Sequence, residues 1–336
     1  MGKTLRTFTL VASVLLSNGA RADGPLEINI GGPSAGYYTL YVAQELGLFE
    51  KQGLIPKFYW FTSGAPLLAG LKSKSIDVTT TGLSTVFALE QGIPLKILYW
   101  EMDHGAGDGF VVPKDSPIKS YKDIGKAKAI AAATGTCAQV NLAVVAKTAG
   151  LKVADMNVIN IAPPLYENAF KGGSIDAAFS WAPYSIILGN AGYKVVNWDA
   201  DYGGVCPSTT SVRADFLEKH PDVGVKLALI NQEVRDIIAK NPELAIKSLM
   251  KNLSLSEPVA KAFYERHCCA KTPTFEEQLS PDGPYSLTSK SGGLAGQLFL
   301  AGQMLYETGT LRSPVSLETI NNAIDPSFIR RVQKDR

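Results

Sequence analysis

Five short segments built mainly from small, hydroxyl-bearing and aromatic residues stand directly before predicted helices. They are GPSAGYY at 32–38, FTSGAP at 61–66, TGLST at 81–85, ATGTCAQ at 133–139 and SWAPY at 180–184. A helix N-terminus offers free backbone N–H groups and the positive end of its dipole, and hydroxyl groups add donors. None of the five segments contains Arg or Lys. The chemistry they predict is therefore reversible binding of an oxyanion by neutral donors.

Ser84, Thr85 and Thr136 are the first candidates for holding the anionic end of a solute. A structural interpretation stands beside this one, because Ser and Thr cap helices and small residues form turns in any protein. The full set of candidate ligand-binding residues comes from the five segments and two further positions: Ser34, Tyr37, Tyr38, Ser63, Gly64, Gly82, Ser84, Thr85, Asp108, Thr134, Thr136, Cys137, Gln139, Trp181 and Ser208.

Aromatic and ionisable side chains near these segments suggest what else the solute carries. Trp181 and Tyr184 could form a wall against a carbon skeleton or an amine, although a tryptophan in the core would fit the pattern as well. Tyr37, Tyr38 and Trp60 at the other turns favour an aromatic-lined pocket, with the same alternative of a place in the core. Asp108, in GAGDGFVV, could pair with an ammonium group or be a solvated turn residue. His104 has no cysteine or carboxylate at metal-ligand spacing, so the sequence predicts neither a metal, nor a cofactor, nor catalysis there.

An alternation of strands and helices must hold these segments in place. Predicted strands cover 26–32, 56–61, 76–81 and 94–102 in one series, and 128–135, 157–164, 175–183 and 193–198 in a second, with helices between them. Strands separated by single helices pair in parallel through helical crossovers. The fold class is therefore α/β, with two doubly wound lobes.

The two series share a repeated stretch. LKSKSIDVTTTGLST at 71–85 and FKGGSIDAAFSWAPY at 170–184 occupy the same place in each series. The repeated Asp77 and Asp176 stand at strand starts, on the edge opposite the candidate turns, so we expect them to cap structure. The last four residues of the two copies differ: the first copy ends in small and hydroxyl residues at 82–85, and the second has aromatic residues at 181–184.

The chain divides into an export signal and two lobes. Lys3 and Arg6 precede an apolar run at 8–16 and a small-x-small cleavage site at 20–22, which predicts a signal peptide over 1–22 and a soluble periplasmic protein from Asp23. The first lobe is expected over 23–111 plus 212–336, where 214–252 and 257–267 have helical periodicity. The second is expected over 112–211. Two crossings between lobes make a hinge with a ligand cleft.

Charge and cysteine content exclude some classes of function. The 33 basic and 31 acidic residues come closer to balance when Lys3, Arg6 and Arg21 leave with the signal, which argues against nucleic acid as a partner. The four cysteines allow three pairings in an oxidising compartment; a Cys137–Cys206 bond is one possibility that the sequence leaves open. The adjacent cysteines 268 and 269 follow His267 without a second ligand cluster.

Several of these stretches together resemble one family of exported proteins. They are GGPSAGYYTLYVAQELGLFEKQGL, SGAPLLAGLKSKSIDVTTTGLST, GFVVPKDSPIKSYKDIGKAKAI, GGSIDAAFSWAPY and VRADFLEKHPDV, spanning 27 to about 223. They resemble the nitrate/sulfonate/taurine-binding proteins of ABC importers. The resemblance implies a type II periplasmic binding protein fold and a monomer. Such a protein binds a small anionic or zwitterionic solute without catalysing any reaction and delivers it to a permease and ATPase complex.

Within that family the chain is most similar to sulfonate- and taurine-binding members, through Trp-Ala-Pro in SWAPY and the segment RADFLEKHP. Asp108 matches an acidic residue of the taurine binders, but a second acidic position of those proteins is Ser208 here. This departure leaves other sulfonates, nitrate, bicarbonate, aromatic acids and pyrimidines open. The alternative is a thiamine-pathway pyrimidine-precursor binding protein or synthase-like enzyme. The latter would need a dedicated Lys, His and cysteine run, which Cys268 and Cys269 match poorly.

Overall fold

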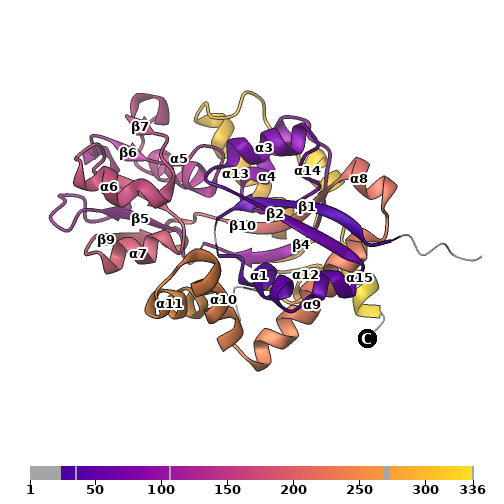
Figure 1. The fold of residues 1–336 in the computed structure, drawn as a ribbon. Coiled ribbons are helices and arrows are strands. Elements are labelled where there is room, and N and C mark those ends of the chain that lie inside the picture. The colour runs from indigo at the N-terminus through magenta and orange to yellow at the C-terminus, as the bar shows by residue number, and fades with distance from the viewer. Residues whose placement is uncertain (1–23, 35, 106, 268–271, 335–336) are drawn as a thin grey trace, which may run out of the picture.

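Two five-stranded sheets form the framework of the molecule. The structure is a computed structural model that describes residues 24–34, 36–105, 107–267 and 272–334, so the predicted signal at 1–22 lies outside the described residues. The strand orders are β2-β1-β3-β10-β4 and β7-β6-β8-β5-β9, and the two sheets lie side by side (Figure 1). The expected α/β fold with two lobes is thereby confirmed.

The first lobe is built on the sheet that contains β1. Its strands are β1 (Leu26–Pro33), β2 (Leu54–Phe61), β3 (Val78–Thr81), β4 (Leu95–Asp103) and β10 (Pro207–Arg213), with helices α1 (Tyr38–Glu45), α2 (Leu48–Lys51), α3 (Gly64–Lys72) and α4 (Ser84–Glu90). β1 pairs in parallel with β2 and β3, whereas β10 inserts antiparallel between β3 and β4. The helix predicted after β1 is divided at Gly47, whose φ of 67° is left-handed.

The second lobe repeats this plan with shorter strands. Its strands are β5 (Gly109–Val112), β6 (Ile130–Ala131), β7 (Val158–Ile159), β8 (Ala177–Ser180) and β9 (Lys194–Trp198), with helices α5 (Cys137–Thr148), α6 (Tyr166–Lys171) and α7 (Tyr184–Asn190). Four short 3-10 helices, η1 to η4, cover Tyr121–Lys126, Val153–Asp155, Pro163–Leu165 and Asp199–Tyr202. β6 pairs in parallel with β7 and β8, and β5 runs antiparallel to β8 and β9.

The chain changes sheets earlier than the lobe boundaries expected after residues 111 and 211. β5 begins at Gly109 and already pairs in the second sheet, and β10 begins at Pro207 and already pairs in the first. The crossings therefore lie at 104–108 and 199–206. Each strand after a crossing belongs to the lobe it enters, because its backbone hydrogen bonds must be made within one continuous sheet.

The repeated aspartates stabilise the same junction in each lobe. Asp77 Oδ2 accepts hydrogen bonds from the backbone and side-chain nitrogens of Asn29, at 3.0 Å each. Asp176 Oδ1 accepts from the backbone N–H groups of Lys128 and Ala129, at 3.1 and 2.9 Å. The structural capping role expected for both residues is confirmed.

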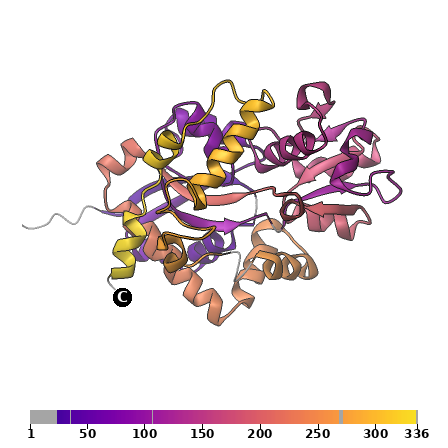
Figure 2. The ribbon, with the colours of Figure 1, turned by 180° about the vertical axis from the view of Figure 1, so that it is seen from behind.

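The C-terminal third is helical and packs mainly on the first lobe. Its helices are α8 (Ala214–Lys219), α9 (Val223–Lys240), α10 (Glu243–Leu253), α11 (Glu257–His267), α12 (Phe275–Leu279), α13 (Gly293–Glu307), α14 (Leu317–Ala323) and α15 (Ser327–Lys334). Seen from behind, α13 to α15 cover the first sheet (Figure 2). Helix α11 also contacts α7, and α13 contacts α5, so both reach the second lobe.

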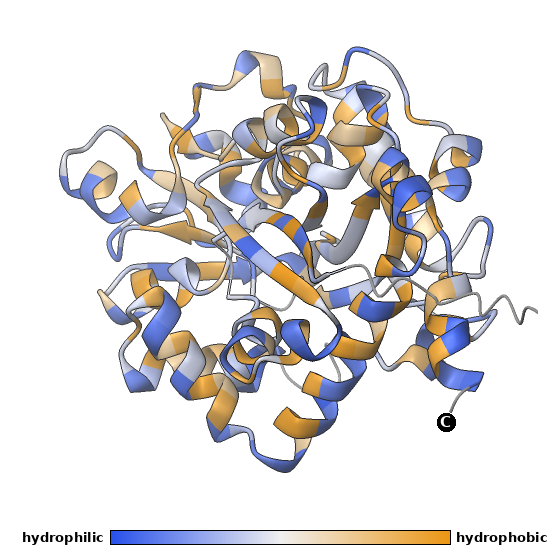
Figure 3. Cartoon of the chain, turned by 45° about the vertical axis from the view of Figure 1, so that its right-hand side comes forward, coloured by the Kyte–Doolittle hydropathy of each residue, from blue (hydrophilic) through white to orange (hydrophobic). Residues whose placement is uncertain are grey.

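The outer helices are amphipathic. Hydrophilic and hydrophobic residues alternate along them, and hydrophobic residues gather on the strands between them (Figure 3). Buried apolar side chains from both lobes and the C-terminal helices belong to one large core cluster. No helix within the described ranges has the length and apolar character needed to cross a membrane.

Candidate functional site

A pocket lies between the lobes, where strands of both sheets end. Pro33 and Thr81 are the last residues of β1 and β3, and Trp181 directly follows β8. The residues that line the pocket are Pro33, Tyr37, Thr81, Gly82, Leu83, Ser84, His104, Asp108, Thr136, Cys137, Trp181, Cys206 and Ser208. A cleft at the carboxyl ends of parallel strands is where open α/β sheets bind ligands.

Asp108 is the acidic residue of this pocket, and it is buried. Among the described residues, neither of its carboxyl oxygens has a well-formed hydrogen bond. Burial raises the pKa of Asp108 well above its usual value, and the nearby charges of Asp199 and Asp103 raise it further. Only the backbone of Ala182 acts to lower this pKa. Since none of the described lining residues is Lys or Arg, a cationic group of a ligand would satisfy this carboxylate.

His104 lies in the same pocket and is also buried. Its ring meets Tyr37 edge-on at 5.7 Å between centroids and lies 5.1 Å from the ring of His267. Burial lowers the pKa of His104 well below its usual value, and His267 lowers it further, so the ring is neutral. Neither ring nitrogen of His104 has a partner among the described residues, which leaves one donor and one acceptor for a ligand.

Tyr37 and Ser208 form a hydroxyl pair on the wall of the pocket. Their oxygens are 3.3 Å apart, and either one can donate to the other. Burial raises the pKa of Tyr37, so its hydroxyl stays protonated. Thr81 adds a third buried hydroxyl, for which the described part of the chain offers no partner. These groups are neutral hydrogen-bond donors of the kind that the sequence predicted for an oxyanion.

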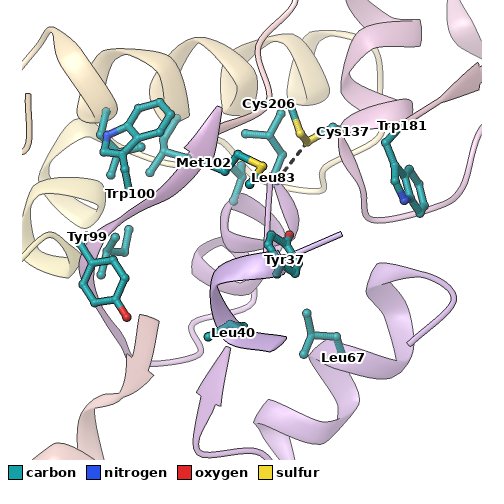
Figure 4. Close-up of a cluster of buried hydrophobic side chains, with 14 of the residues drawn as sticks. Tyr37, Leu40, Leu67, Leu83, Tyr99, Trp100, Met102, Cys137, Trp181 and Cys206 are labelled. Carbon is teal, nitrogen blue, oxygen red and sulfur yellow. Dashed lines mark hydrogen bonds between the residues drawn. A yellow bond between two sulfur atoms is a disulfide. The ribbon is translucent and has the colours of Figure 1, made fainter. Parts of the chain in front are cut away.

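A disulfide joins Cys137 to Cys206 at the pocket. It ties the first residue of α5 to the segment that returns to the first lobe, and so selects one of the pairings that the sequence left open. The backbone N–H of Leu83 donates to Cys137 Sγ at 3.5 Å, as the dashed line in Figure 4 marks. A Cβ on Gly82 would lie 2.6 Å from Cys137 Sγ and 3.0 Å from Cys206 Sγ, so this position requires glycine.

Direct hydrogen bonds between the lobes close the cleft. Ser84 Oγ donates to the carbonyl oxygen of Gly135 at 2.6 Å, and Gly64 N donates to the carbonyl oxygen of Thr134 at 3.3 Å. The indole N–H of Trp181 donates to the carbonyl oxygen of Ser34 at 3.3 Å. The structure is thus a closed form in which protein groups from each lobe satisfy one another.

The pocket brings together about half of the residues predicted from the sequence. Those that line it are Tyr37, Gly82, Ser84, Asp108, Thr136, Cys137, Trp181 and Ser208. Two of the expected anion-binding hydroxyls already donate within the protein: Ser84 to Gly135, and Thr136 Oγ1 to the carbonyl oxygen of Ala133 at 2.7 Å. Their roles toward a solute stay predictions.

The remaining predicted residues do not line the pocket. Ser34, Gly64 and Thr134 make the contacts that close the cleft. The others have separate surroundings: Tyr38 packs on Phe263 and Tyr264, Ser63 precedes α3, Thr85 is buried in α4, and Gln139 accepts a hydrogen bond from Gly135 N.

Five lining residues were not among the predicted ligand contacts: Pro33, Thr81, Leu83, His104 and Cys206. The sequence did mark two of them for other reasons: His104 was weighed as a metal or catalytic residue, and Cys206 as a possible disulfide partner. Pro33, Thr81 and Leu83 adjoin or belong to the predicted turns. Thr81 lies in the predicted turn at 81–85, but it was not chosen as a ligand contact.

Known proteins are similar to most of this chain. A model of the family described as NMT1/THI5 like matches residues 35–245. A Bacillus subtilis protein named for aliphatic sulfonate binding is 32% identical over 239 residues, which are 67% of this chain and 71% of that protein. The taurine-binding periplasmic protein of Escherichia coli is 28% identical over 211 residues, 61% of this chain and 65% of that protein.

A solved structure has the same architecture. It is the alkanesulfonate-binding protein SsuA from Xanthomonas axonopodis pv. citri, bound to MOPS, with a TM-score of 0.75 and 19% sequence identity. The likeness covers 90% of this chain and 99% of that one, and it shows a shared fold.

Proposed function

Because the chain belongs to the NMT1/THI5-like family, we propose that the mature protein is the solute-binding component of an ABC importer in the periplasm. It captures a small sulfonate- or taurine-like solute between its two lobes and delivers it, chemically unchanged, to the membrane permease. The names of the Bacillus subtilis and Escherichia coli relatives support this role. A single chain suffices to form the site, because each lobe supplies one wall of the pocket; the proposal therefore includes a monomer.

The buried carboxylate of Asp108 is the observation that carries the choice of solute. A plain monoanion would be repelled by an ionised Asp108, so the carboxyl would have to stay protonated beside it, as its raised pKa favours in a lining that, among the described residues, has no Lys or Arg. A solute with an ammonium group pairs with Asp108 and neutralises it. The favoured class is therefore a compact zwitterion, such as an aminosulfonate, rather than a simple alkanesulfonate.

Neutral donors bind the acidic end of that zwitterion. The hydroxyl pair of Tyr37 and Ser208, the hydroxyl of Thr81 and the His104 ring all lie in the lining and are buried. Hydrogen bonds to a charged acceptor are stronger than those between neutral groups, and desolvation strengthens them further. Trp181 and Tyr37 pack against the short carbon chain between the two ends.

The experiment is a calorimetric comparison of taurine with ethanesulfonate and isethionate on the purified mature protein. The three solutes share a two-carbon sulfonate, but taurine alone carries an ammonium; isethionate has a hydroxyl in its place, and ethanesulfonate has neither. We expect taurine to bind at least about 10-fold more tightly, and to stabilise the fold by roughly 2.7 kcal/mol at 100 times its dissociation constant. Equal affinity for all three solutes would refute the proposal that Asp108 recognises an ammonium group.

A wider panel tests the role itself. It contains nitrate, bicarbonate, aromatic carboxylates and pyrimidines, each examined by thermal shift and for chemical turnover. Binding without turnover of one class supports the solute-binding role, whatever that class is. Turnover of a pyrimidine, or no thermal shift with any solute, would contradict the role.

A further inference from the structure

A second set of ligand atoms converges in the same pocket. A carboxyl oxygen of Asp108 and the sulfurs of Cys137 and Cys206 all lie within 4.8 Å of one another, and the three residues are buried. His104 lines this pocket as well, and neither of its ring nitrogens has a partner among the described residues. Carboxylate, imidazole and two sulfurs are thus gathered in a pocket whose described lining has no Lys or Arg.

The oxidation state of the two sulfurs decides what this set can bind. In the structure the sulfurs are bonded to each other, and a disulfide sulfur is a poor metal ligand because it carries no charge. As two thiolates they are soft ligands that favour zinc and similar cations. Two cysteines with one histidine and one carboxylate give the four-coordinate environment that zinc prefers.

We propose that reduction of the Cys137–Cys206 disulfide converts the solute pocket into a binding site for one thiophilic divalent cation such as Zn²⁺. A dithiol or phosphine reductant supplies two electrons, the S–S bond breaks and the reductant is oxidised. The cation then binds the two sulfurs as thiolates, and their two thiol protons go to solvent. Asp108 is the third ligand and His104 the fourth.

The sulfur of Cys137 lies close to backbone dipoles that a negatively charged ligand atom would face. Cys137 is the first residue of α5, a 12-residue helix whose N-terminal dipole end stabilises negative charge. The backbone N–H of Leu83 already donates to its sulfur. Gly82 has no side chain, so its backbone lies directly against both sulfurs.

Cation binding and solute binding exclude each other in this site, because both use Asp108. The oxidised protein binds solute, and the reduced protein binds the cation. Cation binding is measured without any solute, so the inference does not depend on which solute the oxidised protein takes.

The test uses the mature protein carrying Cys268→Ser and Cys269→Ser. These cysteines lie outside the described residues and follow His267, so their removal leaves Cys137 and Cys206 as the only thiols. The protein is reduced anaerobically with a phosphine and titrated with Cd²⁺, which gives thiolate-to-cadmium absorbance. Zn²⁺ is then titrated against a chromophoric chelator, and the oxidised protein is treated identically.

We expect one cation per reduced chain, and binding at least about 100-fold weaker after oxidation. Adding Cys137→Ser and Cys206→Ser should abolish the cadmium–thiolate absorbance. Asp108→Asn should weaken Zn²⁺ binding by at least about 10-fold. Asp115→Asn, which changes an exposed carboxylate in the turn after β5, should leave binding unchanged.

Two results would overturn the proposal: equal cation affinity in the reduced and oxidised proteins, or unchanged affinity after both cysteines are replaced. The reduced-to-oxidised comparison needs no substitution at the site, so it remains decisive if a variant folds poorly. Circular dichroism checks the fold of each sample. A failed taurine titration of the oxidised protein would count against the solute proposal alone.

Discussion

The Ser84 hydroxyl of the first lobe donates a 2.6 Å hydrogen bond to the Gly135 carbonyl oxygen of the second lobe. Ser84 is the first residue of α4, and Gly135 lies in the turn before α5. The bond therefore exists only when the lobes are closed. The turns that the sequence marked for oxyanion binding thus also carry the contacts that hold the cleft shut.

Gly64→Ala should prevent this closure. A Cβ at Gly64 would lie 2.1 Å from the Gly135 carbonyl oxygen and 2.9 Å from Ser84 Oγ, so the lobes must move apart to accept it. Because overpacking a tight contact costs about 1–3 kcal/mol, solute affinity should fall by roughly 5- to 150-fold. Calorimetry measures the affinity. Small-angle scattering should show that the ligand-bound variant has a wider average shape than the ligand-bound parent.

The matched control for this variant is Gly189→Ala in α7, where an added Cβ meets no atom within 4 Å. This control should leave solute affinity within about twofold of the parent. The free energy of unfolding of Gly64→Ala should stay near that of the parent, because each lobe keeps its own core. A Gly64→Ala protein with parental affinity would show that closure tolerates the extra carbon.

Asp108→Asn should change which solutes bind. Loss of the buried carboxylate leaves an ammonium group desolvated without its partner, at a cost of about 2–5 kcal/mol. Taurine affinity should therefore fall by at least about 30-fold, whereas ethanesulfonate, which lacks the ammonium, should bind as well or better. A parallel loss for both solutes would mean that Asp108 acts only through the fold.

The ligand-free protein should lose stability as the pH rises from about 7 to 8.5. Burial raises the pKa of Asp199 to about 8, and that of Asp108 also lies well above its usual value. The native state therefore holds protons that the unfolded state has released, and the free energy of unfolding decreases with rising pH. His104, whose pKa is lowered, has the opposite effect, but only below about pH 7.

Urea denaturation at both pH values measures this slope. Asp199→Asn should flatten it, because the variant has no carboxyl to ionise near pH 8. The exposed Asp115→Asn should keep the slope of the parent protein. A free energy of unfolding that stays constant or rises between the two pH values would contradict the assignment of buried, protonated carboxyls.

The sequence predicted the architecture because its signals are local and occur twice. The repeat around Asp77 and Asp176 places the same capped strand in each lobe, and the structure has it at β3 and β8. The point at which the chain changes lobes was harder to predict. The sequence of β10 does not show which sheet the strand joins, because its partners β3 and β4 are distant in sequence.

The site was predicted only in part, because the sequence identifies turns but not the direction of side chains. Tyr37 and Tyr38 are adjacent, yet one lines the pocket and the other packs on Phe263. Ser84 and Thr136 lie at the pocket, but their hydroxyls donate to carbonyl groups. Whether a hydroxyl is free for a ligand depends on tertiary contacts that spacing alone does not encode.

Trp181→Ala should separate solutes by their carbon content. The indole is buried at the pocket, and its N–H reaches across the cleft to Ser34. Removing a buried tryptophan contact costs about 2 kcal/mol, so a solute with a hydrocarbon body should lose roughly 30-fold in affinity. An inorganic oxyanion such as nitrate touches little of the ring and should lose far less. Trp181→Phe keeps an aromatic face without the N–H, so it should retain most of the affinity if packing is the cause. Equal losses for both solutes in Trp181→Ala, measured by calorimetry, would instead assign the tryptophan to closure of the cleft alone.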